Sequence, residues 1–364
     1  MSLKCGIVGL PNVGKSTLFN ALTCAEAAAQ NYPFCTIDPN VGVVPVPDPR
    51  LDRLADLAGS ERRVPATVEF IDIAGLVRGA SRGEGLGNQF LAHIREADAI
   101  VQIVRCFEDH NIVHVDGTVD PVRDCETVLT ELLLADLGTV ERSLEKWRRQ
   151  AKTGDKEARE AQAVLETACK RLDQGIPARE QELGEVERGV LEPLFLLTAK
   201  PSLFIANVDE AYFSGGSGAG GALEEYARGK RTEVIPVCAA LESEISRLDQ
   251  ESREEFLTDL GLSAAGLDRV VEASYRLLGC MTYFTAEPKE ARAWTIRQGV
   301  RALQAAGMIH TDFEKKFICA EVIAYEDYIA SGGEAGAREA GKCRTEGRDY
   351  EVREADVIHF RCNA

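Results

Sequence analysis

The sequence predicts an α/β fold with an inserted helical arm and a second, smaller domain. Three observations support this prediction. A glycine-rich loop joins a strand to a helix near the start, and strand-like runs alternate with helices in the first 120 residues and again after about Leu194. Between them lies a charged, helix-favouring stretch from Pro121 to about Leu194. Because the chain has 364 residues, and single cores stop growing before that length, we expect two or three units.

The glycine-rich loop at residues 9–17 fits the pattern G-x-x-x-x-G-K-[ST]. It follows the strand-like run Cys5–Val8 and precedes the helix-like run Thr17–Leu22, which disfavours the alternative of a turn that binds nothing. Backbone N–H groups of such a loop converge on an anion, and the helix dipole adds to the attraction. We therefore expect Lys15 to reach the β- and γ-phosphates of a nucleotide and the Ser16 hydroxyl to bind magnesium. The other predicted nucleotide-binding positions of the loop are Asn12, Val13, Gly14 and Thr17.

Two later segments carry the remaining groups of a magnesium and phosphate site. The loop at 31–40 contains two prolines and Thr36, our candidate for a second magnesium ligand, although an ordinary turn threonine is the alternative. The strand-like run Pro65–Asp72 ends in an acid that can hold a magnesium-bound water. Gly75, three positions on, can offer its N–H to the γ-phosphate.

The group that orients the attacking water is not evident from these motifs. Leu76 follows Gly75 at the place where a Ras-type enzyme keeps a glutamine, and leucine cannot hydrogen-bond a water. His110 and His114 lie on a polar loop after the strand-like run Ala99–Arg105 and are the candidates for this role. A lone histidine on such a loop is more often an ordinary surface residue.

A third strand-like run, Ser202–Ala206, ends in Asn207-Val208-Asp209-Glu210. GTPases carry N-K-x-D here, with the asparagine supporting the phosphate-binding loop and the aspartate accepting two N–H groups of guanine. Val208 replaces the lysine, and Glu210 replaces the aspartate with a side chain one methylene longer. We therefore expect ATP to be preferred, by a modest margin because only a few hydrogen bonds are involved.

The composition limits the classes of partner. A net charge of −17 with no strongly basic stretch argues against DNA as a partner, and no apolar run reaches the length of a membrane span. Eleven cysteines occur singly, without a C-x-x-C pair, as expected for reduced thiols. The start of the chain resembles no secretory signal. We expect a cytoplasmic protein without a membrane partner.

Taken together, residues 9–17, the Asp72–Leu76 segment, Asn207–Glu210 and the run His310–Lys315 resemble the YchF/Obg-like ATPase family of translation-associated P-loop proteins. The likeness covers essentially the whole chain. It implies a Ras-like P-loop domain (residues 1–120 and 196–280), a coiled-coil insertion (121–195) and a C-terminal, ubiquitin-like TGS domain (281–364).

The resemblance also implies a function: magnesium-dependent ATP hydrolysis that acts as a switch on the ribosome, contacting RNA or ribosomal protein. It favours His114 over His110 as the group that positions the water. Asn12 matches a type of P-loop that can recruit potassium. A redox-sensitive cysteine is implied as well, for which Cys35 is the candidate beside the alternative of an inert thiol. Two alternatives stay open: a GTPase of the same architecture, and a ribosome-binding protein whose nucleotide is only a structural ligand.

Overall fold

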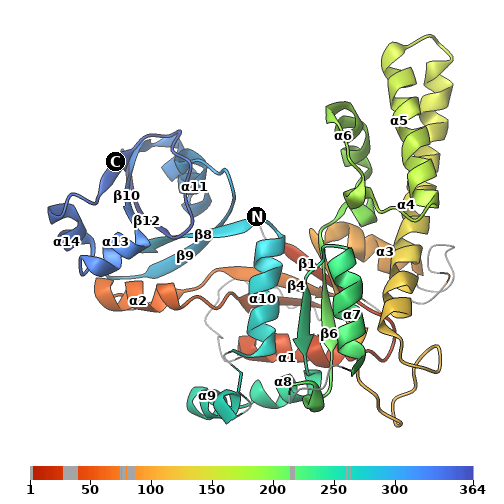
Figure 1. Cartoon of the computed structure of the whole chain (residues 1–364). Coiled ribbons are helices and arrows are strands. Elements are labelled where there is room, and N and C mark those ends of the chain that lie inside the picture. Colours follow the sequence, from red (N-terminus) through yellow and green to blue (C-terminus); the bar gives the residue numbers. More distant parts are fainter. Residues whose placement is uncertain are drawn as a thin grey trace. The chain divides into compact units, whose positions relative to one another are not determined.

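The computed structural model describes residues 3–27, 40–73, 75, 79, 87–213, 218–259, 261–262 and 264–363 (Figure 1). Contacts within the chain divide it into two units. The first unit comprises Met1–Val43 and Glu69–Val270, and the second comprises Val44–Val68 and Val271–Ala364. Among the described residues, no helix combines the length and the apolar character that crossing a membrane requires.

The first unit is built on a six-stranded sheet with strand order β2-β4-β1-β5-β6-β7. From β4 to β7 each pair of neighbouring strands is parallel. Their buried positions are mostly Val, Ile, Leu and Phe, as expected for a sheet covered on both faces. The strands are β1 (Lys4–Val8), β2 (Val41–Pro45), β4 (Thr67–Asp72), β5 (Ala99–Arg105), β6 (Ser202–Asn207) and β7 (Val234–Val237).

The parallel arrangement brings the strand ends to one edge of the sheet. Ile7 near the end of β1 pairs with Asp72 at the end of β4, and Arg105 at the end of β5 pairs with Asn207 at the end of β6. Ligands of open α/β sheets bind outside the carboxyl ends of the strands. The segments that follow these strands are therefore the candidates for a binding site.

Short helices connect these strands and pack beside the sheet (Figure 1). Helix α10 (Gly266–Leu277) carries the chain from the first unit into the second. Within the described residues, the other helices of the first unit outside the arm are α1 (Lys15–Ala27), α3 (Gly87–Glu96), η5 (Glu210–Tyr212), α7 (Gly218–Gly229), α8 (Ala239–Ile245) and α9 (Gln250–Asp259).

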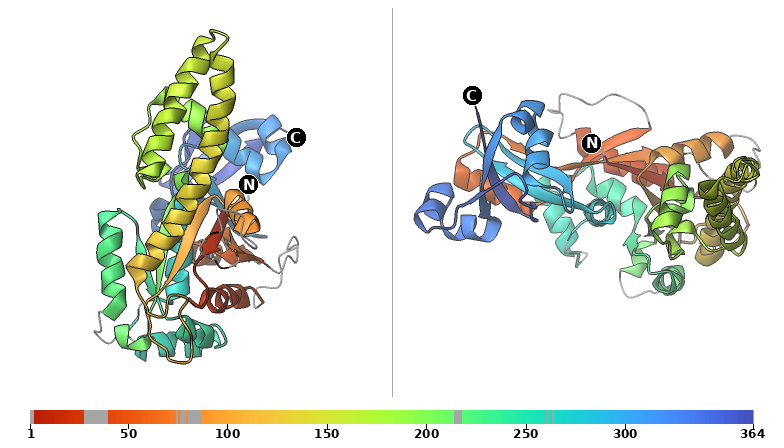
Figure 2. Two further views of the ribbon diagram at one scale, coloured as in Figure 1. Left: turned by 90° about the vertical axis from the view of Figure 1, so that its right-hand side faces the viewer. Right: turned by 90° about the horizontal axis from the view of Figure 1, so that it is seen from above.

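Two long helices, α4 (Pro121–Ala151) and α5 (Lys156–Asp173), form an arm in the stretch between β5 and β6. They lie side by side in both views, joined by a short turn (Figures 1 and 2). Each begins with an aspartate cap: Asp120 accepts the N–H of Arg123, and Asp155 accepts that of Glu157. Shorter helical segments return the chain to the sheet: η2 (Ala178–Glu180), α6 (Glu185–Leu191), η3 (Glu192–Leu194) and η4 (Leu197–Ala199).

The arm has its own small core, in which leucines such as Leu144 and Leu165 are buried. A buried carboxylate holds the end of the arm where the chain returns to the sheet. Asp136, 1% exposed, accepts hydrogen bonds from the backbone N–H groups of Leu197 and Thr198 and from the Thr198 hydroxyl, at 2.7–2.8 Å. The three donors offset part of the cost of burying the carboxylate, and burial still raises the pKa of Asp136 above its usual value. This contact joins α4 to the segment through which the chain leaves the arm.

The second unit contains another six-stranded sheet, with order β11-β10-β12-β8-β9-β3. Its core combines Tyr283, Ile296, Val322 and Ile358 with alanines of α11. Its strands and helices are α2 (Pro49–Ala58), β3 (Arg63–Val64), β8 (Cys280–Ala286), β9 (Ala291–Arg297), α11 (Ala302–Ile309), α12 (Thr311–Lys315), β10 (Phe317–Ala324), α13 (Tyr325–Ala330), α14 (Glu334–Glu339), β11 (Arg344–Glu346) and β12 (Asp356–Cys362).

One part of this unit differs from the predicted division of the chain. We expected residues 44–68 to belong to the P-loop domain, whereas contacts within the chain place them in the second unit. The short strand β3 extends the second sheet by pairing with β9, and the N–H of Glu61 donates to the carbonyl of Pro288. Residues from two distant stretches of the chain therefore share one sheet.

Candidate nucleotide-binding site

A cavity of about 1290 Å³ lies at the carboxyl edge of the first sheet. Its walls come from the segments after β1, β4, β5, β6 and β7, as the topology requires. The predicted site residues that line it are Asn12, Gly14, Lys15, Ser16, Thr17, Asp72, Gly75, Asn207, Val208 and Glu210. Thr36, the predicted magnesium ligand, and Cys35 lie outside the described residues.

The glycine-rich loop has the backbone that the motif demands. Gly14 has φ +91°, and a Cβ built there would lie 2.2 Å from the Asn207 amide nitrogen, so no larger residue fits. Helix α1 begins at Lys15, so its unpaired N–H groups lie at the end that borders the cavity. Val13 is the exception among the predicted loop residues, because it is 1% exposed and does not line the cavity. It can contribute only its backbone.

Asn207 connects three segments of the site. Its amide nitrogen donates to the carbonyl of Val13 at 2.9 Å, and its oxygen accepts the N–H of Ala239 at 3.1 Å. Asn207 is 4% exposed, so both contacts are shielded from water. The residue thus holds the phosphate-binding loop against the segment after β7. This geometry is what an asparagine that supports the P-loop should show.

Lys15 and Asp72 form an ion pair at the edge of the cavity. The Lys15 side chain is about 10% exposed and that of Asp72 about 19% exposed. Gly75 lies beside the loop, since a Cβ on it would be 3.4 Å from the backbone nitrogen of Pro11. A cation, a carboxylate and a backbone N–H therefore border the place where phosphates would bind.

Val208 and Glu210 follow β6 and line another part of the cavity. Val208 is 2% exposed and packs in the core beside α7. The Asp209 carboxylate accepts the N–H of Tyr212 at 3.1 Å and so caps η5. Glu210 is exposed and lines the cavity, so its carboxylate is available to a ligand.

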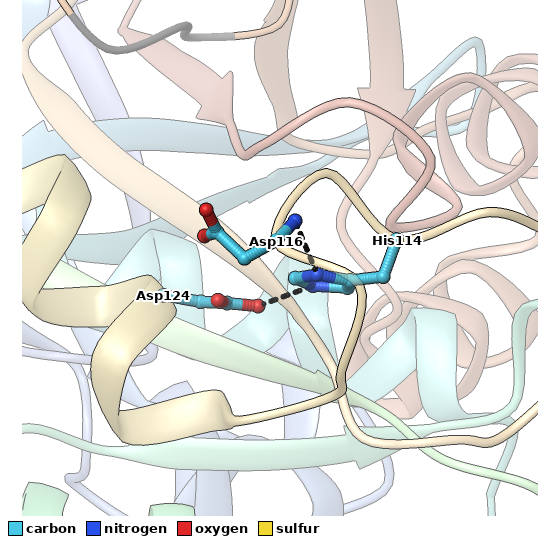
Figure 3. Close-up of side chains that lie close together, drawn as sticks. All are labelled: His114, Asp116 and Asp124. Carbon is cyan, nitrogen blue, oxygen red and sulfur yellow. Dashed lines mark hydrogen bonds and ion pairs between the residues drawn. The ribbon is translucent and has the colours of Figure 1, made fainter.

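His114 does not line this cavity. It is 6% exposed, its Nε2 lies 2.8 Å from Asp124 Oδ2, and its Nδ1 accepts the backbone N–H of Asp116 at 3.1 Å (Figure 3). Both ring nitrogens therefore have partners within the protein. The catalytic role predicted for His114 requires another conformation and stays a prediction.

The ligand atoms of His114, Asp116 and Asp124 lie within 4.8 Å of one another, as in a metal site (Figure 3). Arg123 already supplies positive charge there: its Nη2 is 3.3 Å from Asp124 Oδ1 and its Nε is 3.6 Å from Asp116 Oδ2. A metal ion would have to displace the guanidinium and the histidine hydrogen bonds. We interpret this cluster as a hydrogen-bonded network.

The sequence analysis did not identify two residues that shape the cavity. His93 on α3 is exposed and lines the cavity, but nothing in its local sequence distinguishes it from a surface histidine. Arg105 is 2% exposed and donates to the carbonyls of Phe107, Asp109 and Ile112. It thereby fixes the loop that forms one wall of the cavity. A charged residue at the end of the strand-like run Ala99–Val104 was the signal that could have revealed it.

Burial disfavours the thiolate form of the cysteines near the site. Burial, and next the charge of Asp124, raise the pKa of Cys106 to about 12, and burial raises the pKa of Cys125 well above its usual value. Burial also raises the pKa of Cys238, which lines the cavity. Because the thiolate is the reactive form, these three thiols are poor candidates for redox chemistry.

Known proteins are similar to this chain over its whole length. A family model described as a 50S ribosome-binding GTPase matches residues 4–136, and one named YchF-GTPase_C, described as a protein of unknown function, matches residues 280–363. The Ribosome-binding ATPase YchF of Haemophilus influenzae is 56% identical over 363 residues, which is 100% of both chains. The chain belongs to the YchF family.

Other YchF proteins show the same likeness. The Ribosome-binding ATPase YchF of Bacillus subtilis is 53% identical over 365 residues, with 100% of each chain covered. The solved structure of the Schizosaccharomyces pombe YchF GTPase is 38% identical, covers 99% of this chain and 98% of its own, and superposes with a TM-score of 0.89. At this similarity the YchF fold extends over both units described above.

Proposed function

We propose that this chain is a ribosome-binding ATPase that hydrolyses ATP to ADP and phosphate with Mg²⁺. The observation that carries the proposal is the cavity at the carboxyl edge of the first sheet, where Lys15, Asp72 and Gly75 converge. The names of the YchF relatives supply the ribosome and the ATPase activity. ATP hydrolysis by the purified chain is the first test, and Lys15→Ala should abolish it by removing the cation that meets the phosphates.

The residues that border the phosphate-binding end fit magnesium. The Ser16 hydroxyl and the Asp72 carboxylate both line the cavity, and Mg²⁺ prefers such oxygen donors. Asp72 already holds a cation, the ammonium of Lys15, in this structure. Magnesium would neutralise charge that develops on the β- and γ-phosphates. A second ligand at Thr36 and a potassium ion beside Asn12 are further proposals of the same kind.

The chain's own groups account for binding and for slow turnover. On nucleotide binding Lys15 would exchange Asp72 for the phosphates, while N–H groups of residues 14–17 and of Gly75 hold the phosphate oxygens. No glutamine follows Gly75 to orient the attacking water. His114 would fill that role once released from its present contacts. Intrinsic turnover should therefore be slow, as in unstimulated switches.

We propose that ATP is preferred over GTP because Glu210 stands where GTPases carry an aspartate. A second candidate is a GTPase of the same architecture, favoured by the name of the Schizosaccharomyces pombe relative. Calorimetric titration of each nucleotide with magnesium separates the two. A large preference for GTP would defeat the argument from Glu210.

The output would be conformational. We propose that the nucleotide state rearranges the loops around Thr36 and Gly75 and thereby changes how the arm and the C-terminal unit, a TGS domain by resemblance, contact rRNA or ribosomal protein in the cytoplasm. The remaining alternative is a ribosome-binding protein in which the nucleotide is only structural. Co-sedimentation with ribosomes decides: binding by Lys15→Ala that equals wild type and ignores ATP would favour that alternative.

A further inference from the structure

The segment at residues 112–115 buries its polar residue and exposes its apolar ones. Val113 is 75% exposed, Val115 53% and Ile112 37%, whereas His114 between them is 6% exposed. Apolar side chains ordinarily take the buried positions. Polar contacts, those of His114 and that of Arg105 with the Ile112 carbonyl, therefore hold this segment in place rather than hydrophobic packing.

Those contacts define the state of the imidazole. Nδ1 accepts the N–H of Asp116 and so carries a lone pair, which leaves Nε2 as the protonated nitrogen that donates to Asp124 at 2.8 Å. Both partners are 3% exposed at the side chain (Figure 3). In this arrangement neither nitrogen can orient a water molecule.

The segment nevertheless touches the phosphate-binding loop. The amide nitrogen of Asn12 donates to the carbonyl of Val113 at 3.1 Å, and both Asn12 and Ile112 line the cavity. Because consecutive Cα atoms are about 3.8 Å apart, His114 begins one residue from this contact. A local rearrangement of residues 113–117 would therefore be the route that turns its imidazole toward the cavity.

The geometry points to Asp124 as a positioning residue that holds His114 in a buried, inactive conformation. The rate of basal ATP hydrolysis is then set by how often the hydrogen bond between the two residues breaks. This inference rests on the proposed role of His114 in turnover. Asp124 is well placed for such control because it lies in the first turns of α4, the helix that continues into the arm. Glu131, two turns further on the same face, accepts the N–H of Gly79 at 2.8 Å. A displacement of α4 would loosen both contacts together.

The test measures ATP turnover and ATP affinity of the full-length chain. Asp124→Ala should raise kcat by about ten- to a hundredfold, because a hydrogen bond to a charged group shifts an equilibrium by roughly that factor. ATP affinity should stay unchanged, since Asp124 does not line the cavity. The matched control is Glu126→Ala, an exposed acid on the same helix, which should turn over ATP like wild type.

A double variant shows whether the effect passes through His114. In a His114→Ala background, Asp124→Ala should leave kcat unchanged. If it raised kcat there as much as in the wild-type background, the inference would be overturned. If His114→Ala slows turnover while Asp124→Ala slows it or leaves it unchanged, the inference fails and the proposed function stands. If His114→Ala alone has no effect on kcat, the proposed role of His114 fails instead.

Asp124→Asn keeps the shape of the side chain and a neutral acceptor, so it should give a smaller increase in kcat. It replaces Asp124→Ala if that variant does not fold.

Discussion

Replacing Asn207 by alanine should weaken ATP and GTP binding to the same extent. The substitution removes the hydrogen bonds to Val13 and Ala239 and leaves a buried carbonyl and a buried N–H without partners. Each lost bond is worth about 1 kcal/mol net, so about 2 kcal/mol of support for the phosphate-binding loop disappears. If all of it acts on nucleotide binding, the Kd rises by about 30-fold.

The prediction that ATP and GTP lose affinity by the same factor is the informative part. Asn207 contacts the loop that binds phosphates, which ATP and GTP share, so calorimetric titrations should give the same ratio of Kd values for variant and wild type with each nucleotide. Asn207→Asp separates the two contacts, because its carboxylate still accepts the N–H of Ala239 but repels the carbonyl of Val13. It should bind both nucleotides more weakly than wild type. Asn20→Ala, an exposed asparagine on α1, is the control.

Two results would refute this reasoning. Unchanged affinity in Asn207→Ala would mean that the P-loop keeps its shape without the asparagine. A loss confined to one nucleotide would place Asn207 at the base instead of at the phosphates.

Three further predictions concern other parts of the molecule. Glu210→Asp should shift the ratio of ATP to GTP affinity toward GTP by about tenfold or less, since a few hydrogen bonds are involved; an unchanged ratio in calorimetry would contradict the assignment. Asp136→Ala should destabilise the arm by about 3 kcal/mol because two buried N–H groups and the Thr198 O–H lose their acceptor, and the fluorescence of Trp147 in that core should report earlier unfolding in denaturant. In the second unit, hydrogen bonds from arginines lower the pKa of Glu321 to about 2. Its ionised form therefore stabilises the fold above about pH 4.5, and that contribution is lost as the pH falls toward 2. Glu321→Gln should thus cost about 2 kcal/mol at pH 7 after allowance for solvent screening, and the gap to wild type, followed at Trp294, should close in acid.

The nucleotide site was predictable because its signals are local. A strand, a glycine loop and a helix follow one another within residues 4–27, and parallel strands bring Asp72 and Asn207 to the same edge whatever lies between them in the sequence. The placement of residues 44–68 was not predictable in this way. Strand β3 has two residues, Arg63 and Val64, and neither its length nor its composition indicates which sheet it joins. Its partner β9 follows much later in the chain.

The position of His114 shows where a reading of hydropathy fails. Ile112, Val113 and Val115 are the residues that a hydropathy argument would bury, yet they are exposed and the imidazole is inside. The inversion has two causes, and each comes from outside the segment: Asp124 on the next helix accepts from His114, and Arg105 binds loop carbonyls from the preceding strand. A buried arginine and a buried aspartate thus set the conformation of a loop whose own sequence favours the opposite one. Such a conflict between local preference and tertiary contacts is expected where a segment has to change place during function.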